Sequence, residues 1–170
     1  MKVIEKQNCK IILKENKDGK TDISVSTNSD DYFIGINSCT TNYNIEIIEK
    51  ILDIKGPAYL CDEICRDEDP NYVENHLKKG LFSTIKDTTG LRILDFGCGS
   101  GSSTIILNRI FKDSEIVGVE LEKPLLEIAS LRKKFYKYKN IELMLSPNPN
   151  DLPSGIGEFD VIIFSAVFEH

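Results

Sequence analysis

The sequence predicts an α/β protein: a parallel β-sheet with flanking helices in residues 91–170, preceded by a small α+β region. After residue 90, short apolar runs of strand length alternate with segments of helical periodicity, the pattern of parallel strands joined by helical crossovers. Before residue 90, two strand-like runs flank a short polar gap and a separate helical segment follows, which is typical of mixed local structure.

Composition places the chain among ordinary globular proteins. It has 170 residues, of which 41% are hydrophobic, enough to bury a substantial core. The 27 acidic and 21 basic residues give a formal net charge of −6, which argues against nucleic-acid binding as the main function. The N-terminus lacks the apolar stretch of a secretory signal, no apolar run approaches the ~20 residues of a membrane helix, and the 5 cysteines form no disulfide framework. We therefore expect a cytoplasmic protein with reduced thiols and no membrane partner.

Residues 1–56 are expected to form an accessory region of a hairpin and a helix. Cys9–Glu15 and Thr21–Thr27 are strand-like runs, and the polar gap between them contains an Asp-Gly step, which is a hairpin signal. A third short strand is expected at Tyr32–Asn37. The periodicity of Asn44–Lys55 predicts a helix, which a Gly-Pro step ends.

Residues 57–90 are expected to form a helical connector. Apolar residues at every fourth position predict a helix over Tyr72–Lys86, and a weaker helical pattern precedes it. Cys61 and Cys65 lie one turn apart in the weaker part, but together with His76 they match no common zinc spacing, so no metal site is predicted. Acidic residues also gather there, and we interpret them as a solvated helix face and loop: Asp62, Glu63, Asp67, Glu68 and Asp69.

The second half of the chain is expected to alternate strands with helices. Helices are predicted from about Ser102 and at Pro124, since proline is favoured in the first turn of a helix. The four expected strands are Arg92–Phe96, Ile116–Glu120, Ile141–Leu145 and Asp160–Phe164. A basic run is interpreted as the end of the second helix, where cations complement the helix dipole: Arg132, Lys133, Lys134, Lys137 and Lys139.

A glycine-rich turn joins the first of these strands to its helix. Glycines at 97, 99 and 101 let the backbone turn tightly and a ligand approach it closely, and the helix N-terminus offers backbone amides. Glu120 ends the next strand, where an acid is well placed to accept both hydroxyls of a ribose. A dinucleotide fingerprint would need glycine at the position of Ser102 and usually lacks an acid at that of Asp95, so an NAD-dependent oxidoreductase is disfavoured.

The string Ile93–Gly101 resembles the first motif of the class I S-adenosylmethionine-dependent methyltransferases. Val117–Glu120, followed by a helix with Leu126 and Ala129, resembles the second, and residues 152–170 resemble later motifs of the small-molecule, type 11/12-like branch. The resemblance implies a Rossmann-like sheet, S-adenosylmethionine as the cofactor, and methyl transfer to an unidentified small-molecule acceptor. The alternative is a catalytically silent S-adenosylmethionine-binding or interaction module.

The resemblance assigns the glycine-rich turn to cofactor binding. Gly97, Gly99 and Gly101 would lie beneath the methionine part and the ribose. Cys98 would be a small residue of the same cofactor-binding turn rather than a reactive thiol. Asp95 would orient the turn and meet the cofactor's ammonium, directly or through water.

The resemblance also assigns residues after the later strands. Glu120 would hold the ribose hydroxyls, Leu121 would pack on the adenine, and Asn148 would accept a hydrogen bond from the adenine amino group through its side-chain oxygen. Ser165 would lie near the methionine moiety. His170 is the candidate general base, because a base is optional for transfer of an activated methyl group.

The family's sheet normally continues beyond the fourth strand, where this sequence stops. The resemblance therefore implies the strand order 3-2-1-4, which leaves the fourth strand as an apolar edge. Either the chain is a fragment of a longer protein, which we favour, or residues 1–90 cover that edge. Self-association through the open edge is the protein contact that this arrangement predicts.

Overall fold

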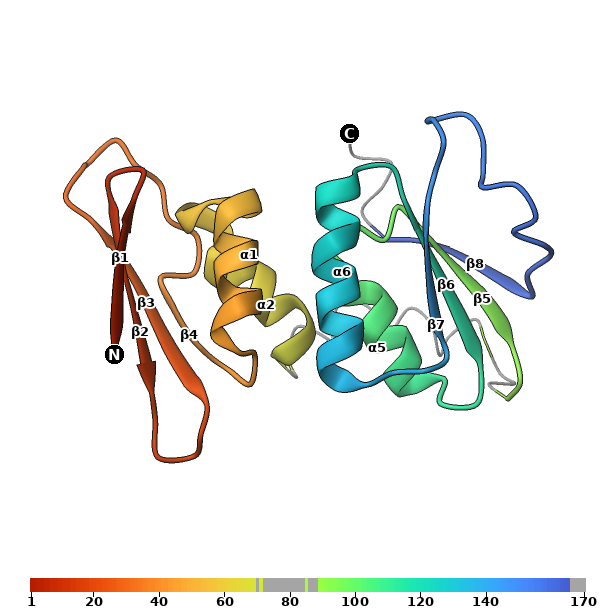
Figure 1. Cartoon of the computed structure of the whole chain (residues 1–170), viewed down its shortest axis with the longest axis horizontal. Helices are drawn as coiled ribbons and strands as arrows, with labels where there is room; N and C mark the ends of the chain where they lie inside the picture. The colour runs from red at the N-terminus through yellow and green to blue at the C-terminus, as the bar shows by residue number, and fades with distance from the viewer. Residues whose placement is uncertain (70, 72–84, 86–88, 166–170) are drawn as a thin grey trace. The chain divides into compact units, whose positions relative to one another are not determined.

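The computed structural model describes residues 1–69, 71, 85 and 89–165, and the chain divides into two compact units, residues 1–70 and 71–170 (Figure 1). The helix expected at Tyr72–Lys86 falls almost wholly outside the described residues, as does His170. The domain boundaries expected after residues 56 and 90 stay predictions.

The first unit contains a four-stranded antiparallel sheet in the order β1-β2-β3-β4. Its strands are β1 Lys2–Lys6, β2 Cys9–Glu15, β3 Thr21–Thr27 and β4 Ser38–Thr41. The predicted hairpin is confirmed with its bounds, because the Asp-Gly turn sets the pairing of Glu15 with Thr21. The strand expected at Tyr32–Asn37 is wrong: this segment bends so that the Gly35 N–H donates to Ala58 O (3.2 Å), and the polar run at 38–41 pairs with β3 instead.

Helices α1 Ile45–Lys55 and α2 Leu60–Glu68 follow, joined by the short 3₁₀ helix η1 Pro57–Tyr59. The predicted helix α1 is confirmed, and the Asn44 side chain caps it by accepting the Ile47 N–H (3.1 Å). The solvated acidic face predicted for α2 is partly wrong. Glu63 and Asp67 are buried because they share the helix face of the apolar core residues, and Asp67 accepts a hydrogen bond from the Tyr43 hydroxyl (2.5 Å).

The second unit is a parallel sheet with helices, and it confirms the predicted Rossmann-like arrangement. Its elements in chain order are β5 Arg92–Phe96, α5 Ser102–Ile110, β6 Glu115–Glu120, α6 Lys123–Tyr136, β7 Ile141–Leu145 and β8 Val161–Phe164. The strand order β7-β6-β5-β8 is the expected 3-2-1-4. Figure 1 shows α5 and α6 on the same side of this sheet, as right-handed crossovers in one direction require.

Alternate strand residues supply two apolar clusters, one on each face of the parallel sheet. On the helix-covered face, Ile93 and Ile116 pack against α5 residues and Phe111. On the other face, Leu94 and Val117 are covered by Ile156 of the loop 146–160. No helix in the described residues is long and apolar enough to cross a membrane.

Strand β8 lies at one edge of the described sheet and exposes apolar side chains. Ile162 and Phe164 retain 52% and 46% of their accessible surface. The apolar edge predicted from the sequence is therefore present in the part of the chain that the structure describes.

Candidate functional site

The glycine-rich loop, residues 97–101, leaves the carboxyl end of β5 and leads into α5. The backbone N–H groups of Gly97 and Cys98 both donate to Val119 O, at 2.9 and 3.0 Å, so the loop begins against the end of β6. Because the carboxyl ends of parallel strands share one edge of the sheet, the loop and Glu120 lie together. The glycine-rich loop and Glu120, which were both predicted from the sequence as parts of one site, are therefore adjacent.

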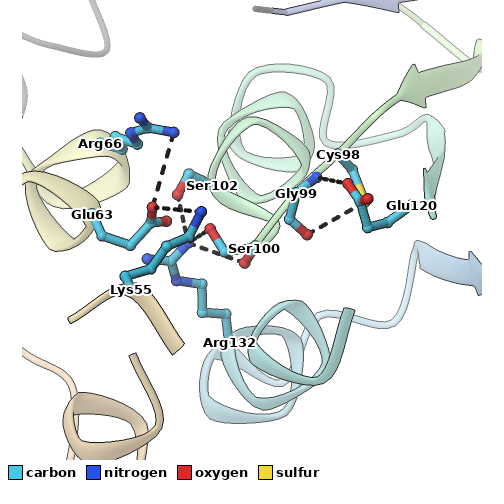
Figure 2. Close-up of polar contacts among 9 residues, drawn as sticks. All are labelled: Lys55, Glu63, Arg66, Cys98, Gly99, Ser100, Ser102, Glu120 and Arg132. Atoms are coloured by element: carbon cyan, nitrogen blue, oxygen red, sulfur yellow. Dashed lines mark hydrogen bonds and ion pairs between the residues drawn. The ribbon is translucent and has the colours of Figure 1, made fainter. Parts of the chain in front are cut away.

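Glu120 is 9% exposed, and its carboxylate accepts three backbone N–H groups. Oε2 accepts the N–H of Gly99 (2.7 Å), while Oε1 accepts those of Leu121 (2.7 Å) and Glu122 (2.9 Å). Figure 2 shows the first of these bonds, which joins the acid directly to the glycine-rich loop. A carboxylate oxygen can accept two hydrogen bonds, so Oε2 keeps an acceptor position for a ligand donor.

Two glycines of the loop have different surroundings. Gly99 adopts a φ of +55°, and a Cβ there would meet no atom of the described residues within 4 Å. Gly101 adopts a φ of +86°, and a Cβ there would lie 2.6 Å from the Ala129 Cβ on α6. Gly99 is therefore the open position of the loop, where a ligand can approach the backbone, while Gly101 lets two helices pack closely.

Asp95, on β5, is fully buried beside the loop. Its Oδ2 accepts hydrogen bonds from the hydroxyls of Ser103 (2.7 Å) and Thr104 (2.6 Å) in the first turn of α5. Its Oδ1 has no hydrogen-bond partner among the described residues. Burial raises the pKa of Asp95 to about 6, the two hydroxyls oppose that rise, and the charge of Glu120 adds to it.

The other predicted cofactor-binding residues lie in varied surroundings. Cys98 is 4% exposed, and burial raises the pKa of its thiol well above the usual value. Leu121 is 45% exposed directly after Glu120. Ser165 follows β8 and is half-buried. His170, the candidate base, lies outside the described residues.

Asn148 shapes its own loop after β7. Its Oδ1 accepts the backbone N–H groups of Asn150 (2.8 Å) and Asp151 (3.0 Å), and its Nδ2 donates to the Asp151 carboxylate (2.7 Å). The oxygen expected to meet an adenine amino group thus already accepts two hydrogen bonds. This local turn is what the Asn-Pro-Asn-Asp sequence favours.

Arg132 contacts the loop and was not predicted to do so. The sequence placed it in a basic run at the end of a helix, where cations complement the dipole, whereas the structure buries it completely on α6. It lies three residues after Ala129 and four after Ile128, which are both buried, so it continues the buried stripe of the helix. That spacing was the available signal, and the neighbouring lysines obscured it.

Comparisons with known proteins match the second half of the chain. A family model described as a methyltransferase domain matches residues 87–170. A protein-L-isoaspartate O-methyltransferase from Nitrobacter winogradskyi is 38% identical over 46% of this chain and 35% of its own length. A demethylmenaquinone methyltransferase from Lactococcus lactis is 39% identical over 45% of this chain and 30% of its own.

Among solved structures, PKMT2 from Rickettsia typhi in complex with AdoHcy is 28% identical, with a TM-score of 0.44 over 49% of this chain and 16% of that chain. The curated relatives also match only part of this chain, 45% or 46% of it for the first five. The chain covers about a third of the length of those relatives, from 30% to 36% for the first five.

Proposed function

We propose, from the premise that residues 87–170 are a class I S-adenosylmethionine-dependent methyltransferase domain, that the protein transfers a methyl group from S-adenosylmethionine to a small-molecule acceptor. The observation that carries the proposal is the contact between Gly99 and Glu120, at the junction of the loop and the carboxyl end of β6. The contact joins the open backbone at Gly99 to the Glu120 carboxylate, whose Oε2 can accept one more hydrogen bond.

The residues of this edge fit the chemical groups of S-adenosylmethionine. The open backbone at Gly99 leaves room for the ligand, and the Oε2 of Glu120 can accept a ribose hydroxyl. The Oδ1 of Asp95, which has no hydrogen-bond partner in the part of the chain that the structure describes, supplies negative charge for the ammonium, directly or through water. The exposed side chain of Leu121 offers an apolar surface for the adenine.

S-adenosylmethionine supplies a methyl group that its sulfonium already activates. The chain's own residues then have to bind, orient and exclude water, and alignment with the acceptor can lower much of the barrier. The glycine-rich loop and Glu120 perform the orienting part, since hydrogen bonds within the chain hold both in place.

The test is calorimetric titration of the whole chain with S-adenosylhomocysteine, the demethylated product, which requires no knowledge of the acceptor. We expect Glu120→Ala to weaken binding by about 1–3 kcal/mol, the range for leaving hydrogen-bonding groups unpaired. Glu115→Ala is the matched control, because Glu115 is an acid of the same strand at its opposite end, paired with Arg92 (2.8 Å). It should bind like the unaltered chain.

Two results would contradict the proposal. One is a chain that circular dichroism shows to be folded but that binds no S-adenosylhomocysteine. The other is binding of NADH that survives competition by S-adenosylhomocysteine, which would favour an oxidoreductase.

A further inference from the structure

A buried arginine joins helix α6 to the glycine-rich loop. Arg132 is 0% exposed, and its Nη1 donates to the backbone oxygen of Ser100 (3.0 Å), to the Ser100 hydroxyl (3.0 Å) and to the Ser102 hydroxyl (Figure 2). A guanidinium is costly to bury unless acceptors satisfy its N–H groups. Here the loop and the first residue of α5 provide such acceptors.

A second contact comes from the same face of α6. Ala129 lies one turn before Arg132 and packs against Gly101, where a Cβ would come within 2.6 Å. Residues 100, 101 and 102 are therefore held in succession by two side chains of one helix. Gly99, the next residue toward β5, is held from the other direction by Glu120.

We propose that Arg132 is a positioning residue for the cofactor loop: by binding Ser100 and Ser102 it keeps the backbone around Gly99 in the conformation that accepts the ligand. The inference rests on the proposed function, because it assigns Arg132 a part in the binding of S-adenosylmethionine. A loop held before binding loses less conformational freedom on binding, which raises affinity without any contact between Arg132 and the ligand.

The chain order strengthens this role. Helix α6 begins at Lys123, immediately after the turn whose N–H groups bind the Glu120 carboxylate. The acid and Arg132 thus belong to one continuous strand–turn–helix segment, and both hold the loop. Motion of α6 relative to β6 would disturb both at once.

Lysine keeps the positive charge but lacks the planar guanidinium, so its ammonium does not take the place of Nη1 between the acceptors of Ser100 and Ser102. We therefore expect Arg132→Lys to weaken the binding of S-adenosylhomocysteine roughly tenfold, the effect of losing one charge-assisted hydrogen bond. Ser102→Ala, which removes one acceptor and keeps the arginine, should weaken binding in the same direction and by less. Calorimetric titration of the full chain measures both.

Hydrogen exchange without ligand separates positioning from general stability. In the unliganded chain, Arg132→Lys and Ser102→Ala should speed amide exchange in the peptide covering residues 97–103. Ile116→Val is the control, since Ile116 is fully buried at the opposite end of β6. It should lower the melting temperature but leave both the dissociation constant and the loop exchange unchanged.

The outcomes distinguish this inference from the proposed function. If the unaltered chain binds S-adenosylhomocysteine and both variants bind it equally well, the inference is overturned and the proposed function stands. If the unaltered chain does not bind, the proposed function fails, and with it the assignment of Arg132 to cofactor binding, whatever the loop exchange shows. If Arg132→Lys does not fold, Ser102→Ala decides by the same two measurements.

Discussion

Three backbone N–H groups converge on the carboxylate of Glu120, one from Gly99 and two from the turn that leads into α6. Hydrogen bonds to an ionised acceptor are stronger than neutral ones, so this single side chain ties the loop to the turn. A donor that arrives at Oε2 meets an acceptor whose direction is already set. The residue that we propose binds the ligand therefore also joins the glycine-rich loop to the turn before α6.

The titration of Asp95 predicts how the stability of the protein depends on pH. Its pKa is raised to about 6 in the folded chain, chiefly by burial, from the 3.8 of an unperturbed aspartate. Between these two values the folded state binds more protons than the unfolded state. The free energy of unfolding therefore falls as pH rises through that window and stays lower above it, by on the order of 1–3 kcal/mol.

We expect Asp95→Asn to remove this pH dependence, because an amide does not titrate. Urea unfolding of both proteins between about pH 4 and pH 7 measures the difference in unfolding free energy at each pH. The variant should gain stability relative to the unaltered chain as pH rises. A difference that stays constant with pH would contradict the raised pKa of Asp95, and Asp18→Asn, in the exposed hairpin turn, serves as control.

At the element scale, the contact between the loop and α6 depends on the absence of a side chain at Gly101. An alanine there would adopt a strained φ of +86° and place its Cβ 2.6 Å from that of Ala129 and 2.9 Å from the Ala129 Cα. We expect Gly101→Ala to destabilise the protein by about 2–4 kcal/mol, the sum of backbone strain and overpacking.

Gly155→Ala is the matched comparison, since Gly155 has a similar φ of +73° with no atom within 4 Å. It should cost only the strain, about 1 kcal/mol. Thermal unfolding of both variants measures the difference. Equal losses would mean that close packing against α6 contributes nothing at Gly101.

Elements with a strong local pattern were predictable. The β2–β3 hairpin, α1 and the four parallel strands follow from turn residues and periodicity alone. Strand β4 was misplaced because the apolar run before it looked more strand-like than the polar run that pairs with β3. The burial of Glu63 and Asp67 on α2 was also not predicted. It results from how the helix packs in the folded chain, whereas the sequence shows only a cluster of charged residues.

At the scale of the whole molecule, the sequence predicted which residues lie together at the carboxyl edge of the sheet. It did not predict the contacts from α6 that hold the glycine-rich loop there. Gly99 and Glu120 could be placed together because the ends of parallel strands coincide. The pairing of Arg132 with Ser100 and Ser102 could not be predicted, because it joins residues 30 or more positions apart in the chain. Pairings of this kind arise from the crossing of helices, which periodicity does not encode.

Strand β8 and the net charge of the molecule act in opposite directions on association. Ile162 and Phe164 are exposed on β8, an edge strand among the described residues, and we expect this strand to offer apolar surface and backbone hydrogen-bonding groups to a second copy. The net charge of −6 repels that copy at pH 7. Salt screens the repulsion, so association of the unaltered chain should strengthen with ionic strength.

Ile162→Lys tests the contribution of this edge, because a charge on an edge strand is the usual means of preventing strand-to-strand association. We expect the substitution to reduce self-association at every salt concentration, measured by sedimentation velocity over a range of protein concentrations. Ile45→Lys, which alters a comparably exposed isoleucine in the first unit (45% against 52%), should leave the salt-dependent association in place. Equal effects of the two substitutions would show that added charge acts wherever it is placed, and the edge would then have no special part in association.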